Sequence, residues 1–158
     1  MTPEEPWKEL YSYWRSRQVN GRAPKRSELD IPMEVPKLLP NVMLIDCIDD
    51  RLRYRLVGSA MWERYRMELT GTWIEERNAA ETEWRGTIAL VRDDGIPRLV
   101  SSPVAGEGSR SHIAVAMPLL NAEGRVFQIL AGTFYAQDYG EKLRMGRLKI
   151  QEILDDRP

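Results

Sequence analysis

The sequence has few of the residues that many enzymes use for nucleophilic catalysis or metal binding. Its 158 residues include one cysteine, Cys47, and one histidine, His112. A lone cysteine cannot close an internal disulfide, which suits a reducing compartment. A zinc site needs three or four nitrogen, sulfur or carboxylate ligands at suitable spacing, and no such cluster surrounds these two residues. The sequence therefore predicts neither a disulfide framework nor a metal site.

An excess of charge of one sign and long apolar runs are also missing. The 23 Lys and Arg residues against 24 Asp and Glu give a net charge of -1, whereas a protein built to neutralise phosphates would carry a basic excess. The acidic start, residues 1–6, has no apolar signal core. Apolar runs such as residues 113–120 fall far short of the ~20 residues that span a bilayer. We expect a cytoplasmic protein with no membrane segment and no nucleic-acid partner.

The composition is that of one domain, because 42% hydrophobic residues suffice for a core and the length is typical. Residues 1–21 predict an amphipathic helix with Thr2 as N-cap, Pro3 at the first helical position and Glu5 closing a capping box. The pair Asn20-Gly21 is expected to end the helix. Residues 22–40 carry four prolines and predict an irregular connecting arm.

Further along, the chain predicts alternating strands and helices. An almost continuously apolar run at 42–48 predicts a strand covered on both faces, and Asp49-Asp50 turns it into a strand centred on Tyr54. A helical stretch over 58–71 follows, and Asn78 to Glu81 forms a second capping box before a helix that Asp94-Gly95 ends. Three strands then follow, at 98–104, 111–120 and 125–136. Residues 141–154 fit a helix and a strand about equally well.

Five short motifs occur in order along the chain: Tyr13-Trp14, Pro24-Lys25-Arg26, Leu38-Leu39-Pro40, the segment from Tyr54 to Gly58, and Leu69-Thr70-Gly71. Together they resemble a bacterial family of small single-domain PAS-like proteins, and the resemblance covers roughly residues 7–136. It implies an α+β fold: a five-stranded antiparallel sheet in the order second, first, fifth, fourth, third, with helices on one face and an N-terminal helix. The PAS-like core would occupy residues 41–137, with a C-terminal extension at 138–158.

The same resemblance implies a cup between the sheet and its helices. Ligand sites combine apolar walls with a few polar groups, and an aromatic core is the competing interpretation. The candidate pocket residues are Tyr54, Arg55, Trp62, Trp73, Trp84, Ser102 and Met117.

The N-terminal helix carries a wide apolar stripe, formed by Trp7, Leu10, Tyr11 and Trp14 at positions i, i+3, i+4 and i+7. In PAS-like proteins such a helix often covers the sheet and also joins two copies of the chain. We expect it to cover the outer face of the sheet and to contribute to a homodimer.

Other chemistries have less support. In the implied strand order another strand separates Cys47 from His112, so they lie roughly 10 Å apart, too far for a nucleophile pair. The long helix has no histidine for haem and residues 58–78 have no cysteine for a covalent flavin, so the cofactor stays unknown.

The loop at 106–110 lacks the Gly-Lys-Ser/Thr of a phosphate loop. Arg51, Arg53 and Arg55 form a basic row, read as a charge-protected edge strand or, less readily, as a nucleic-acid contact.

These observations predict a non-catalytic sensory or interaction domain. It would bind a small molecule or a protein partner and signal through dimer or partner contacts, with the output in another protein because the chain stops at Pro158. The alternative is a small α+β enzyme of hydrolase type that uses a carboxylate or a serine in the cup; two converging carboxylates, or His112 beside a serine, would favour it.

Overall fold

The computed structural model describes residues 5–61, 66–77, 79–103, 110–137 and 148–150. Several sequence predictions fall outside these ranges: the N-cap roles of Thr2 and Asn78, the side chain of Trp62, the loop at 104–109, and most of the C-terminal extension. Among the described helices, none is long and apolar enough to cross a bilayer.

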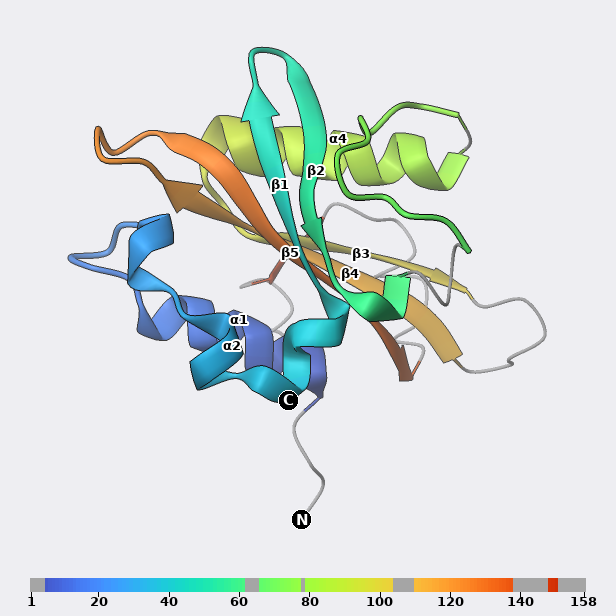
Figure 1. Ribbon diagram of the computed structural model, residues 1–158, viewed down its shortest axis with the longest axis horizontal. Helices are drawn as coiled ribbons and strands as arrows, with labels where there is room; N and C mark the ends of the chain where they lie inside the picture. The colour runs from blue at the N-terminus through green and yellow to red at the C-terminus, as the bar shows by residue number, and fades with distance from the viewer. Residues whose placement is uncertain (1–4, 62–65, 78, 104–109, 138–147, 151–158) are drawn as a thin grey trace.

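One antiparallel sheet organises the chain (Figure 1). Its strands lie in the order β2-β1-β5-β4-β3-β6, which confirms the predicted five-strand order and adds a two-residue strand at the β3 edge. The strands are β1 (Val42–Ile48), β2 (Arg51–Val57), β3 (Arg98–Pro103), β4 (Arg110–Leu120), β5 (Val126–Gln137) and β6 (Leu148–Lys149). All the pairings are antiparallel.

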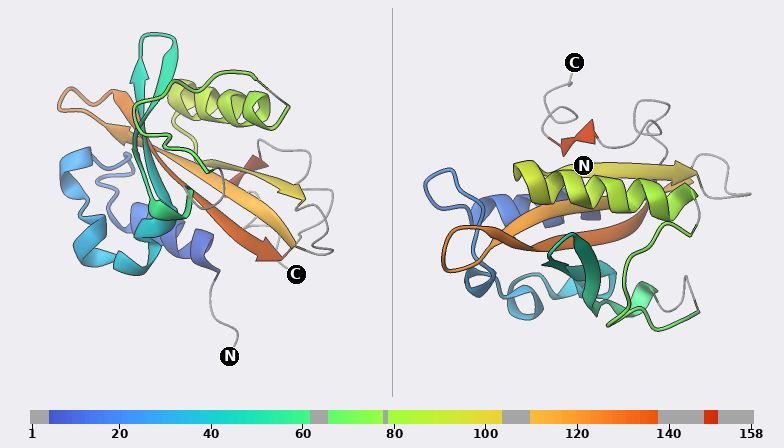
Figure 2. Two further views of the ribbon diagram at one scale, coloured as in Figure 1. Left: turned by 45° about the vertical axis from the view of Figure 1, so that its right-hand side comes forward. Right: turned by 90° about the horizontal axis from the view of Figure 1, so that it is seen from above.

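Helices cover both faces of this sheet. Helix α4 (Ala79–Asp94) packs on one face, and α1 (Pro6–Ser16) with α2 (Ile31–Glu34) lies on the other, as Figures 1 and 2 show. Two separate apolar clusters result, one on each face. Side chains of successive strand residues point to opposite faces, so a strand with apolar residues at consecutive positions feeds both clusters. The predicted cover of the outer face by the N-terminal helix is therefore confirmed.

The ends of α1 differ from the prediction. The helix begins at Pro6 with Glu5 as its N-cap, and the Glu5 carboxylate accepts a 2.6 Å hydrogen bond from the Trp7 indole instead of closing a capping box. It ends at Ser16, before the Asn-Gly pair. Both Asn20 and Gly21 have positive φ, in a tight turn between the bridged residues Val19 and Arg22. Asn-Gly is the preferred pair for such a two-residue turn, so here it makes a turn beyond the helix.

The proline-rich arm is not irregular throughout. It contains two short 3₁₀ helices, η1 (Arg26–Glu28) and η2 (Pro36–Asn41), with α2 between them. Pro32 and Pro36 lie in the first turns of α2 and η2, where a missing N–H costs nothing. The Asp30 side chain caps α2 by accepting from the Met33 N–H.

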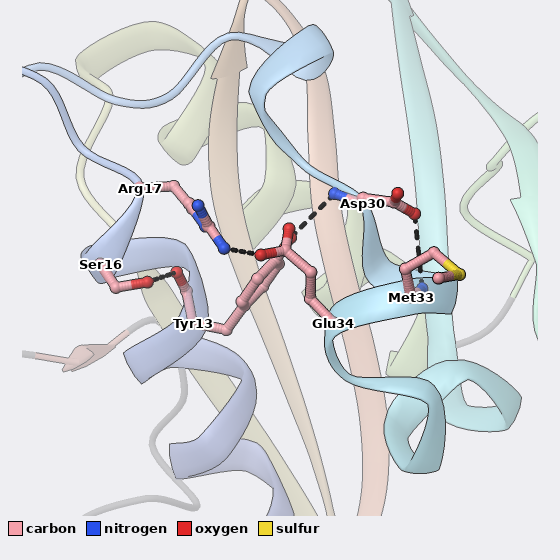
Figure 3. A network of polar contacts seen from close by, with 6 residues as sticks. All are labelled: Tyr13, Ser16, Arg17, Asp30, Met33 and Glu34. Atoms are coloured by element: carbon pink, nitrogen blue, oxygen red, sulfur yellow. Dashed lines mark hydrogen bonds and ion pairs between the residues drawn. The ribbon is translucent and has the colours of Figure 1, made fainter.

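A polar network joins α1 to α2 (Figure 3). The Tyr13 hydroxyl donates a 2.8 Å hydrogen bond to the Glu34 carboxylate and accepts another from the Asp30 N–H, also at 2.8 Å. Arg17 forms an ion pair with the same carboxylate, and its guanidinium lies 5.4 Å from the centre of the Tyr13 ring. These contacts hold the arm against the helix on the outer side of the sheet.

Candidate functional site on the α4 face

The face of the sheet beneath α4 has an apolar floor with small side chains at its centre. Met43 of β1, Ala131 of β5 and Ala116 of β4 are aligned across three neighbouring strands, and all three are buried. The buried cluster on this face comprises Met43, Ile45, Leu52, Met61, Leu69, Ile74, Ile88, Val91, Ala116, Ile129 and Ala131. Ala116 and Ala131 carry smaller side chains than the other members of this cluster.

Two aromatic side chains border this cluster. Tyr54 comes from β2 and Trp84 from the first half of α4, and both are half-buried against it. Both residues extend the floor and remain partly exposed to solvent. Of the predicted pocket residues whose side chains the structure describes, Tyr54 and Trp84 are the two that it brings to the same cluster.

A hydrogen-bonded ion pair lies at the start of α4. The Glu81 carboxylate accepts hydrogen bonds from the Arg77 side chain, at 3.2 and 3.3 Å, and from the Glu75 N–H at 2.9 Å. The hydrogen bond to Glu81 raises the pKa of Arg77, with the charge of Glu81 next and a smaller contribution from Tyr54. Within α4, the buried Thr87 hydroxyl donates to the Glu83 carbonyl at 2.8 Å. The Arg77–Glu81 pair thus lies at the start of α4, the helix that carries Trp84.

At the far end of the same row, an ion pair joins α4 to β3. Arg98 pairs with Ala116 in the sheet and is only 7% exposed. Its guanidinium donates to both oxygens of Asp94, at 2.8 and 2.7 Å. This hydrogen-bonded pair holds the pKa of Asp94 below its ordinary value. The last turn of α4 is therefore tied to the first residue of β3.

Two predicted pocket residues lie elsewhere. Met117 belongs to the cluster on the α1 face, together with Leu130, its neighbour on β5. Trp73 stacks with Arg51 and Arg53, which alternate with the cup-facing Leu52 and Tyr54 along β2. Both placements follow from strand register, because a shift of one residue moves a side chain to the opposite face.

The other residues predicted for the pocket or for a dimer interface do not join this cluster in the described part of the chain. Arg55 is exposed, at a register shift where β2 departs from regular pairing with β1. The backbone of Ser102 pairs with His112, while its side chain lies outside the described part of the chain. The apolar residues predicted for a dimer, Trp7, Leu10, Tyr11 and Trp14, are buried within this chain. Their role in a dimer stays a prediction.

Cys47 and His112 do not form a nucleophile pair. They lie on β1 and β4, and β5 runs between these strands, as predicted. Burial is the main cause that raises the pKa of the Cys47 thiol to about 11. A protonated, half-buried thiol is a poor nucleophile. Within the described ranges, no group of three or more His, Cys, Asp or Glu side chains could hold a metal ion.

Sequence reasoning missed several residues of this site. The Arg77–Glu81 pair flanks the predicted helix start, so the capping-box pattern was its nearest signal. Ala116 and Ala131 had no recognisable sequence signal. Both of their strands are apolar at consecutive positions, so alternation does not show which residues face α4.

The comparisons with known proteins agree with this architecture. The chain matches the PAS domain family over residues 2–131. It belongs to that family. PAS domains in general are sensory and interaction modules, and the same holds for this one at that level. No curated protein matches the chain.

Two solved structures match this PAS domain at low sequence identity. The PAS domain of BvgS from Bordetella pertussis is 19% identical, with a TM-score of 0.49, and the match covers 75% of this chain and 90% of that one. The IcIR transcriptional regulator from Alicyclobacillus acidocaldarius is 17% identical, with a TM-score of 0.28, over 66% of this chain and 54% of the other.

The motifs of this PAS domain hold its framework together. Trp14 donates its indole N–H to the Pro118 carbonyl at 2.8 Å, and Pro24 accepts from the Leu120 N–H at 3.0 Å. Gly71 donates to the Tyr54 carbonyl at 2.7 Å, so the Leu-Thr-Gly motif lies along the outer edge of β2. Most of the motif residues therefore position the strands around the site, whereas Tyr54, Val57 and Leu69 belong to its apolar cluster.

Proposed function

We propose that this PAS domain is a non-catalytic sensory domain that binds a small, largely apolar molecule on the α4 face of its sheet. One observation carries the proposal: an alanine-centred apolar floor is bordered by the half-buried Tyr54 and Trp84. Ligand sites commonly combine such a surface with a few polar groups that fix orientation, a role that Tyr54 and Arg77 would fill. Glu81 is held by Arg77 and by the Glu75 N–H, which fits a structural role better than acid–base catalysis.

Signalling would use the elements tied to this face. A ligand that displaced α4 would act on the Asp94–Arg98 pair, and through it on β3 and β6 at the far edge of the sheet. A dimer formed through α1 would have to use its exposed side, for example Ser12 and Arg15, because the apolar stripe already packs on the sheet. Protein partners are the second class of occupant for the same face.

Native mass spectrometry of freshly purified protein, together with an absorption spectrum, tests the proposal. We expect a bound mass that is lost in Trp84→Ala and kept in Trp73→Phe, because Trp73 lies on the other side of β2. A clean apo mass would contradict the small-molecule proposal. A bound mass that persists in Trp84→Ala would move the site away from the α4 face.

A further inference from the structure

The side of β2 that faces away from the candidate site carries two arginines stacked on one tryptophan. The Arg51 guanidinium lies 3.8 Å from the centre of the Trp73 ring, and that of Arg53 lies 5.3 Å from it. Both distances are within the range of cation–π interactions. Stacking restricts two flexible side chains, so the positive charges are already organised on this surface.

Arg53 is also held by an acidic side chain of the neighbouring strand β1. Arg53 forms an ion pair with Asp46 at 3.6 Å, and Asp46 also accepts a 2.8 Å hydrogen bond from the Gln128 side-chain amide. The three residues are neighbours in register across β2, β1 and β5, and Gln128 is only 8% exposed. Arg51, in contrast, is exposed and has no carboxylate within ion-pair distance among the residues that the structure describes. Its charge is available to a partner.

The tryptophan belongs to a short segment that forms the outermost edge of the sheet. Thr72 accepts from the Tyr54 N–H and Ile74 donates to the Leu52 carbonyl, which bridges Trp73 to Arg53 in antiparallel fashion. Backbone groups alternate in direction along such a pair, so the N–H and C=O of Trp73 point away from β2. An extended segment of another protein could pair with this edge by strand addition.

We propose that this surface, formed by Arg51, Arg53 and Trp73, docks an extended acidic segment of a partner protein. Arg51 and Arg53 are two residues apart on one face of a strand, about 7 Å along it. Acidic side chains at alternate positions of an extended partner have the same spacing, so two carboxylates meet two guanidiniums. Tryptophan and arginine are also the residue types that most often dominate the energy of protein interfaces. The site lies opposite Tyr54 on β2 and does not depend on a ligand at the α4 face.

The surrounding charges favour a short acidic segment over nucleic acid. Asp49 and Asp50 in the adjoining turn, and Glu75 and Glu76 beyond Trp73, are all exposed. A phosphate backbone running past the arginines in either direction would approach these carboxylates, whereas nucleic-acid binding relies on an extended basic surface. An acidic segment that presents its carboxylates only over the two arginines avoids this repulsion.

Fluorescence anisotropy with a labelled ten-residue Thr/Val peptide that carries Glu only at its fifth and seventh positions tests the proposal in the full chain. We expect salt-dependent binding, weakened at least tenfold by Arg51→Glu and also weakened by Arg51→Gln and Trp73→Ala. Trp73→Phe keeps an aromatic face and should bind more tightly than Trp73→Ala. The control is Arg125→Glu, a charge reversal at an exposed site in the β4–β5 turn, which should change affinity less than twofold.

Four outcomes would overturn the proposal. One is unchanged binding in Arg51→Glu when circular dichroism shows the variant to be folded, and another is an equal loss in Arg125→Glu. A third is equally tight binding of the matching peptide with Lys in place of both Glu residues, or tighter binding of a ten-nucleotide thymidine strand with the same dependence on Arg51. The fourth is sedimentation showing that Arg51→Glu separates a wild-type dimer, because the occupant would then be a second copy of the chain.

Discussion

The carbonyl oxygen of Pro40 lies so close to Gly58 that a Cβ atom at position 58 would be 2.2 Å from it. The Leu39 oxygen would be 2.5 Å from the same atom, and the Gly58 N–H donates to the Val42 carbonyl at 2.8 Å. The end of β2 is thereby held against η2. Pro40 and Gly58 are 18 residues apart in sequence, and through them the Leu-Leu-Pro and Tyr-Arg-Leu-x-Gly motifs meet by their backbones.

Gly58→Ala should destabilise the fold, because both obstructing atoms belong to the backbone and cannot swing aside. A loss of about 3 kcal/mol is expected, at the upper end of the usual range for single substitutions. Chemical denaturation followed by circular dichroism measures it. Ser59→Ala, at the exposed next residue, is the control and should change stability little. Equal stability of the two variants would contradict the close approach of η2 to β2.

Asp94→Asn should destabilise the protein by about 2 kcal/mol, because the nearly buried Arg98 would lose its charged partner. The matched control is Asp93→Asn, whose ion pair with Arg92 is at the surface and contributes a few tenths of a kcal/mol. Unfolding free energies of the two variants at pH 7 make the comparison.

The same pair predicts a pH dependence. Arg98 lowers the pKa of Asp94 in the folded state, so its stabilisation is complete above the ordinary carboxyl pKa of about 4. This stabilisation is lost as the pH falls through the lowered pKa that Asp94 has in the folded state. The difference in unfolding free energy between wild type and Asp94→Asn should therefore shrink in acid. A difference that stays constant down to pH 2 would assign the effect to something other than this carboxylate.

Cys47 should react slowly with thiol reagents. With its pKa raised to about 11 by burial, roughly one thiol in a thousand is ionised at pH 8, against about a quarter of unperturbed thiols. The rate of iodoacetamide labelling of the folded protein, compared with glutathione, measures this. Since the folded pKa is the higher one, the stability due to the neutral thiol is complete below about pH 8.5 and lost as the pH rises towards 11. Labelling at the rate of glutathione would contradict the assignment.

Tyr13→Phe should cost about 1–2 kcal/mol, because Glu34 and the Asp30 N–H both lose a hydrogen-bond partner. A double-mutant cycle with Glu34→Gln separates the Tyr13–Glu34 contact from the rest of the network and should give a coupling of about 1 kcal/mol. Thermal unfolding of the four proteins supplies the values. Additive effects would mean that the hydroxyl and the carboxylate act independently.

The sequence predicted the sheet order because the resemblance to PAS-like proteins fixes topology, and because the motif residues make the contacts that define it. Trp14 reaches Pro118, and Gly71 reaches Tyr54. Each contact joins segments that local patterns cannot connect. The order of motifs along the chain therefore carried more information than any helix or strand pattern.

The candidate site was predicted less completely, for reasons of register. β4 is apolar at consecutive positions, so alternation could not show that Ala116 faces α4 and Met117 faces α1. Trp73 is oriented by its pairing with the edge of β2, which local sequence does not encode. Tyr54 and Trp84 were found because one lies in a clearly alternating strand and the other on the apolar side of a periodic helix.

The hydrogen bond from Trp14 to Pro118 spans 104 residues of chain. During synthesis, α1 leaves the ribosome long before β4 and β5, the strands on which it packs. Until these arrive, the tryptophans of α1 have no core to enter and remain exposed to other nascent chains. The core on the α1 face therefore forms only after β4 and β5 have been synthesised, and shortened chains that end before β5 should aggregate.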